Sequence, residues 1–114
     1  MIALTLFNLS ILYLCAHFIG DFAFQSAWMA MEKGKNVEVL IYHSATYTAP
    51  FAALLALLDG HTPYVPSVLF ALVIFGTHIV IDTLSARMKV IKTIWADQLC
   101  HFAVIAGLLF VGWL

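Results

Sequence analysis

Residues 65–84, VPSVLFALVIFGTHIVIDTL, form a 20-residue apolar stretch in which His78 and Asp82 are the only ionisable side chains. An α-helix needs about 20 apolar residues to cross roughly 30 Å of hydrocarbon. Each ionisable side chain at mid-membrane costs about 2.5–3.5 kcal/mol on insertion scales. The stretch therefore predicts a membrane-spanning helix that carries two costly polar groups for a structural or functional reason.

Three further segments, at about residues 2–24, 39–58 and 94–114, are similarly apolar. The chain is 64% hydrophobic and 10% charged, whereas soluble domains are roughly 25% charged. Polar and helix-breaking residues separate the segments at 32–36, 59–63 and 87–92. We therefore expect an all-α fold, an integral membrane four-helix bundle in which residues 1–114 form a single transmembrane domain with helices at about 2–24, 39–58, 65–84 and 94–114.

The basic residues predict the orientation of this bundle. All of them fall in the first and third connections: Lys33, Lys35, Arg87, Lys89 and Lys92. The positive-inside rule then predicts two cytoplasmic connections, with both termini outside. No basic residue precedes the first segment and no clear cleavage site follows it, so we expect a permanent helix and not a signal peptide. Cys15 and Cys100 form no CxxC motif and are expected to be free thiols.

Three histidine–aspartate pairs have a spacing of four residues, which places both side chains on one face of a helix. Together with His43, all three pairs lie toward the predicted cytoplasmic ends of their helices. His61 is different, because it follows Asp59 and Gly60 in the outer connection and is expected in a turn. The pairs are His17 with Asp21, His78 with Asp82, and Asp97 with His101.

Side chains of this kind converge inside helix bundles at carboxylate-bridged metal sites. Histidine nitrogen and aspartate oxygen suit zinc, manganese or iron, as one ion or two. Asp97 and His43 are each expected as either a ligand or the catalytic base, and four neighbours are placed to hydrogen-bond the ligands and orient them. The expected metal ligands are His17, Asp21, His78, Asp82 and His101, and the expected orienting residues are Gln25, Gln98, Thr46 and Tyr47.

Several motifs in the same order resemble the bacterial and phage membrane family catalogued as domain of unknown function 3307. The resemblance covers nearly the whole chain and implies a multi-pass protein of the bacterial inner membrane, either bacterial or phage-encoded. It implies no activity. The motifs are His17-Phe-Ile-Gly-Asp-Phe-Ala-Phe-Gln25, Trp28-Met29-Ala30 with Lys33, Tyr42-His43-Ser44, His78-Ile-Val-Ile-Asp82 and Asp97-Gln98-Leu-Cys-His101.

A weaker similarity runs to the YdjM-type membrane-bound metal-dependent hydrolases. It rests on the early His17, on His43-Ser44 and on Gly76-Thr-His78-Ile-Val-Ile-Asp82. The chain departs from that pattern at Val39 and Leu40, where a histidine and an arginine would stand. This resemblance implies a bound metal and a hydrolytic reaction.

Three classes of function remain open from the sequence. A metal-dependent hydrolase would use metal-activated water, and the basic connections would attract an anionic lipid headgroup or phosphoester. An ion or proton transporter or channel subunit would need polar groups in the outer halves of the helices, where Thr5, Asn8, Ser10 and Tyr13 all belong to one segment. A structural or interaction protein would use the polar cluster for packing.

The sequence also bears on the binding partners of the protein. Membrane lipids are expected partners, and formation of a homo-oligomer stays open. No nucleic-acid binding is expected.

Overall fold

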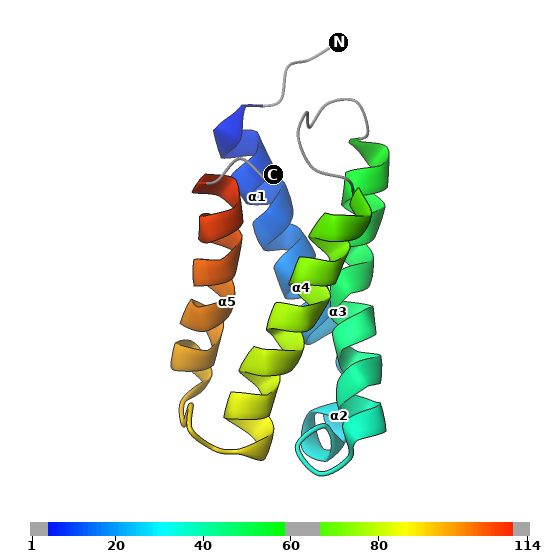
Figure 1. The fold of residues 1–114 in the computed structure, drawn as a ribbon, viewed down its shortest axis with the longest axis vertical. Coiled ribbons are helices and arrows are strands. Elements are labelled where there is room, and N and C mark those ends of the chain that lie inside the picture. The colour runs from blue at the N-terminus through cyan, green and yellow to red at the C-terminus, as the bar shows by residue number, and fades with distance from the viewer. Residues whose placement is uncertain (1–4, 59–66, 111–114) are drawn as a thin grey trace.

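A computed structural model describes residues 5–58 and 67–110, and all regular elements in these ranges are helical (Figure 1). The predicted all-α class is therefore confirmed. The expected turn at His61 and the predicted helix ends at 2–4, 65–66 and 111–114 lie outside the described residues. The elements are α1 (Leu6–Phe18), η1 (Ile19–Ala23), α2 (Ala27–Glu32), α3 (Val37–Leu57), α4 (Ser67–Asp82), η2 (Thr83–Arg87) and α5 (Ile94–Phe110).

Three helical stretches are long and apolar enough to cross a membrane, namely Leu6–Ala23, Val37–Leu57 and Val68–Arg87. The first joins α1 to η1, and the third joins most of α4 to η2. Helix α5 is also apolar, but it has 17 residues, fewer than the about 20 that a span requires. These lengths support a membrane protein, while the fourth span and the orientation stay predictions.

Helices α1, α3, α4 and α5 run side by side along the long axis of the molecule (Figure 1). The first turn of α1 and the last turns of α3 and α5 lie at one end. At the other end lie α2, the beginnings of α3 and α5, and the end of α4. The two connections that carry the basic residues therefore share one end of the molecule.

An apolar core fills the half of the molecule away from these connections. The Tyr13 ring contacts Phe51 and Phe70, with ring centroids 5.9 and 5.7 Å away, and the two phenylalanine rings contact each other at 6.4 Å. Ile74 and Ile105 pack in the same buried cluster. Large apolar side chains also cover the outer surface, as expected for helices that face lipid; they include Phe7, Ile11, Val68, Leu72 and Phe110. The apolar core thus fills one end, and the buried polar residues lie at the other.

The first connection contains a helix that hydropathy does not predict. Ser26 is the N-cap of α2, and its hydroxyl accepts a hydrogen bond from the Met29 backbone N–H at 3.1 Å. Asn36 caps α3 in the same way, accepting from the Glu38 backbone N–H at 2.9 Å. As a result α3 begins at Val37, two residues before the predicted start at 39.

Two π-helical segments continue the α-helices into the polar end. Their i+5 hydrogen bonds join Phe24 N to Ile19 O at 2.9 Å and Met88 N to Thr83 O at 2.8 Å. Asp21 lies within η1, and Asp82 is the last residue of α4 before η2 begins. Single π turns are frequent at functional sites, and here each one adjoins a buried carboxylate.

Candidate metal centre

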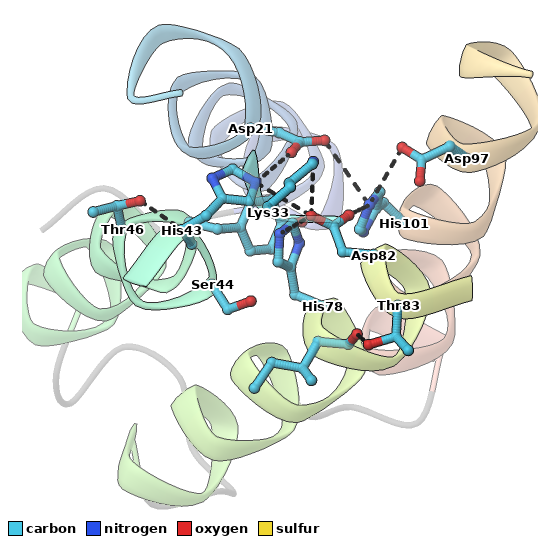
Figure 2. Close-up of polar contacts among 12 residues, drawn as sticks. Asp21, Lys33, His43, Ser44, Thr46, His78, Asp82, Thr83, Asp97 and His101 are labelled. Carbon is cyan, nitrogen blue, oxygen red and sulfur yellow. Dashed lines mark hydrogen bonds and ion pairs between the residues drawn. The ribbon is translucent and has the colours of Figure 1, made fainter. Parts of the chain in front are cut away.

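Two buried aspartates form the middle of the polar end (Figure 2). Asp21 from η1 is 3% exposed and Asp82 from α4 is 1% exposed. His43 from α3 faces both of them, because its Nε2 lies 3.3 Å from Asp21 Oδ1 and 3.4 Å from Asp82 Oδ2. A single imidazole nitrogen thus lies between carboxylates from two different helical elements.

Two further histidines direct Nε2 at the same carboxylates. His78 Nε2 lies 3.3 Å from Asp82 Oδ2, across one turn of α4. His101 Nε2, from α5, lies 3.7 Å from Asp82 Oδ1, 3.9 Å from Asp21 Oδ2 and 3.6 Å from Asp97 Oδ2. We refer to Asp21, His43, His78, Asp82 and His101 as the His/Asp centre.

The separations of His43 and His78 from the two aspartates match the spacing of ligands on a shared cation. N–H···O bonds are about 2.7–3.2 Å long, whereas the distances from His43 and His78 to the carboxylates are 3.3–3.4 Å. Two ligand atoms that each lie about 2.1 Å from one ion are roughly 3.0–3.4 Å apart in octahedral or tetrahedral geometry. His101 lies further out, at 3.7 and 3.9 Å from Asp82 and Asp21. Three overlapping groups have ligand atoms within 4.8 Å of one another: Asp21/His78/His101, His43/His78/Asp82 and Asp82/Asp97/His101.

Unpaired buried nitrogens point to the same conclusion. Within the described part of the chain, neither ring nitrogen of His78 has a hydrogen-bond partner, and the same holds for His101 Nε2 and His43 Nδ1. Buried polar atoms are nearly always paired in folded proteins. A cation at the His/Asp centre would satisfy His78 and His101 Nε2 at once, so the donor set fits a metal ion.

His17 lies beside the centre and has other partners. Its Nε2 lies 2.7 Å from Gln98 Oε1 and its Nδ1 lies 2.8 Å from the Tyr47 hydroxyl. An amide oxygen only accepts, so the His17 Nε2–H donates to Gln98 and the Tyr47 O–H donates to Nδ1. Both nitrogens of this predicted ligand are therefore used in hydrogen bonds. In place of the predicted His17–Asp21 contact, Asp21 in the π-helical turn faces His43 and Gln98.

Two of the predicted orienting residues contact the centre directly. Gln98 Nε2 donates to Asp21 Oδ2 at 2.9 Å and to Asp97 Oδ2 at 3.2 Å. The Tyr47 ring stacks on His78, with centroids 3.8 Å apart and planes at 18°. These contacts fix the positions of one carboxylate and one imidazole.

The other two predicted orienting residues lie further out. The Thr46 hydroxyl donates to the backbone carbonyl of His43 at 2.8 Å, so it touches the helix and not the ring (Figure 2). Gln25 lies on the wall of a neighbouring pocket, and its buried Oε1 has no hydrogen-bond partner in the described ranges.

Lys33 enters the site although the sequence suggested only a role in topology or anion attraction. Its Nζ lies 2.8 Å from Asp82 Oδ2, and its side chain is 13% exposed. The two residues are 49 positions apart, so helical spacing gave no signal for this contact. The ammonium group shows that the Asp82 carboxylate attracts a cation.

A pocket of about 490 Å³ opens beside the centre, at the end that carries the basic connections. Asp21, Asp97 and Gln98 line its inner wall, and Lys33 lies between the pocket and Asp82. Pockets that bind small molecules commonly measure about 300–1,000 Å³. The His/Asp centre therefore has a neighbouring space of suitable size for a substrate.

Comparison with known proteins gives one match. The model of a family described as protein of unknown function (DUF3307) matches residues 9–113. Searches among curated proteins and among solved structures found no match. The match confirms the resemblance to the domain of unknown function 3307, and the similarity to YdjM-type hydrolases stays an expectation.

Proposed function

The chain belongs to the DUF3307 family, whose description assigns no function, and we propose that it is a membrane metalloenzyme that catalyses hydrolysis at its His/Asp centre. The observation that carries the proposal is the convergence of three buried histidines on two buried aspartates. Their Nε2 atoms come from α3, α4 and α5 and lie 3.3–3.9 Å from the carboxylate oxygens.

A bound ion accounts for this arrangement better than a packing role does. A buried polar network is costly when some of its members lack partners, and His78 lacks a partner at both ring nitrogens within the described residues. Imidazole and carboxylate ligands favour zinc, manganese or iron over magnesium or calcium. We propose that one of these transition metals is held by Asp21, His43, His78, Asp82 and His101.

The neighbouring pocket favours catalysis over simple metal storage. A divalent ion would supply a water nucleophile near neutral pH. Asp97 lies on the pocket wall, and its buried Oδ1 has no hydrogen-bond partner among the described residues. A carboxylate in this position fits the role of general base, which takes the proton from the attacking water. If the basic connections lie inside, as the positive-inside rule predicts, the pocket would open to the cytoplasm.

The metal is tested by elemental analysis of detergent-purified protein. Wild type is compared with His78→Ala/Asp82→Ala, and with His61→Ala/Asp59→Ala as a control that removes the same residue types elsewhere. We expect about one or two transition-metal ions per chain in wild type and in the control, and none in the site variant. A wild-type protein that binds no metal, even after zinc or manganese is added, would refute the proposal.

The hydrolytic step is tested with Asp97→Asn, which keeps the size of the side chain and removes the base. With a phosphoester as the substrate, we expect the rate of phosphate release to fall by roughly 10²–10⁴-fold while the metal content stays at the wild-type level. Asp59→Asn serves as the matched control. A full rate in Asp97→Asn would remove this residue from the proposed mechanism.

A further inference from the structure

We propose that the pocket beside the His/Asp centre binds the phosphate group of an anionic phosphomonoester, which names the substrate class of the proposed function and rests on it. Three lysines line this single pocket together with the aspartates of the site. Lys33 comes from the connection between α2 and α3, whereas Lys89 and Lys92 come from the connection between η2 and α5. Basic groups from two separate parts of the chain thus meet at one cavity.

Two of these lysines form no direct ion pair with an acidic side chain of the described residues. Lys89 and Lys92 are exposed and form no ion pair in the described part of the chain, while Lys33 is paired with Asp82. Lys35 differs from them, because it pairs with Glu32 at 3.8 Å and does not line this pocket. Unpaired ammonium groups on a pocket wall attract anions.

The metal decides the net charge of the pocket. Lys33 is already paired with Asp82, and Asp21 and Asp97 oppose the other two lysines on the lining, so the pocket without an ion offers an anion little net attraction. A divalent ion at the His/Asp centre would offset the two carboxylates and leave the lysine charges in excess. Phosphate binding is therefore expected to require the metal, and the lysines would hold the phosphate beside it.

The backbone at Lys89 is held in an uncommon conformation. Lys89 has a φ of 57°, in the left-handed region that side chains other than glycine seldom adopt. The turn is closed by hydrogen bonds from the Val90 and Ile91 N–H groups to the Leu84 carbonyl, at 2.8 and 3.2 Å. Such strain persists where the surrounding structure fixes it, and it is common at ligand-binding sites.

The volume of the pocket and its apolar lining residues favour a phosphate ester over inorganic phosphate. A volume of about 490 Å³ exceeds what one phosphate needs, and Phe22, Ile91 and Ile94 add apolar surface for a carbon skeleton. A phosphomonoester can reach the pocket as a soluble metabolite or as a lipid headgroup. Both sources present the same terminal phosphate, and the experiment separates them.

The test uses metal-loaded protein in phosphatidylcholine nanodiscs. One arm titrates glycerol 3-phosphate by calorimetry, and the other adds phosphatidic acid to the bilayer and detects bound lipid by native mass spectrometry. Lys89→Gln/Lys92→Gln is compared with Lys35→Gln/Arg87→Gln, a control that removes two positive charges at the same end of the molecule from residues that do not line this pocket. Metal content is measured first on every sample.

We expect wild type and the control to bind, and the Lys89/Lys92 variant to bind roughly tenfold more weakly or worse with unchanged metal content. Binding of glycerol 3-phosphate supports a soluble substrate, and binding only of phosphatidic acid supports a lipid. Metal-loaded wild type that binds neither probe would overturn the inference, as would equal binding by the two double variants. If the wild-type protein contains no metal in the first measurement, that result would instead refute the proposed function.

Discussion

Lys33 would compete with a metal ion for the Asp82 carboxylate. Its ammonium group lies 2.8 Å from the same Oδ2 atom that faces His43 and His78. Two like charges close together in a partly buried site repel each other. The Asp82 carboxylate therefore binds the Lys33 ammonium group, a metal ion, or both with weaker contacts to each.

Replacing Lys33 should consequently strengthen metal binding. We expect Lys33→Met to lower the dissociation constant for zinc by about tenfold, which corresponds to roughly 1.4 kcal/mol of relieved repulsion. The measurement is a competition titration against a fluorescent chelator, with Lys35→Met as the control because Lys35 is 71% exposed and pairs only with Glu32. Zinc affinity that stays the same or falls in Lys33→Met would show that the lysine does not compete for Asp82.

At the level of the elements, the close contact between η1 and α3 sets the position of Asp21. A Cβ atom added to Gly20 would lie 2.6 Å from the Tyr47 carbonyl oxygen and 2.9 Å from Tyr47 Cα. Both atoms belong to the backbone, so the two elements would have to move apart. Gly20 therefore lies at a close contact between the two elements. Gly107 in α5 differs from it, because an added Cβ there would meet no atom within 4 Å.

Gly20→Ala should therefore destabilise the protein by about 1–3 kcal/mol, the usual cost of overpacking. Gly107→Ala is the matched control and should leave the stability unchanged or slightly higher, because alanine is the better helix former. Thermal unfolding in detergent, followed by circular dichroism, measures both. Equal midpoints for the two variants would mean that η1 and α3 are not held in close contact.

The long helices could be predicted from hydropathy, but the short elements could not. Apolar runs located α3, α4, α5 and the stretch of α1 with η1 to within a few residues of the structure over the described ranges. Helix α2 has only six residues and begins after the Ser26 cap. A hydropathy profile averages over longer windows and does not detect so short a helix. The π-helical turns also escaped prediction, because a spacing of four residues assumes α-helical geometry. For this reason His78 and Asp82 meet as expected, while Asp21 is turned toward His43 and Gln98.

At the scale of the whole molecule, the polar and apolar residues are separated along the long axis. The gathering of His43, His78 and His101 at one end followed from alternating helix directions and was predictable. Contacts such as Lys33 with Asp82 and Gln98 with Asp21 join residues 49 and 77 positions apart, and no periodicity in a single sequence encodes them. Cys15 and Cys100 are free thiols, as predicted.

The most direct test of the metal centre is X-ray absorption at the zinc edge of the zinc-loaded protein. We predict nitrogen and oxygen neighbours at about 2.0–2.2 Å, with outer-shell scattering from at least two imidazole rings. A sulfur neighbour at about 2.3 Å, supplied by Cys15 or Cys100, would contradict the account. So would a shell of oxygen atoms without imidazole scattering, because the ion would then lie outside the three-histidine arrangement.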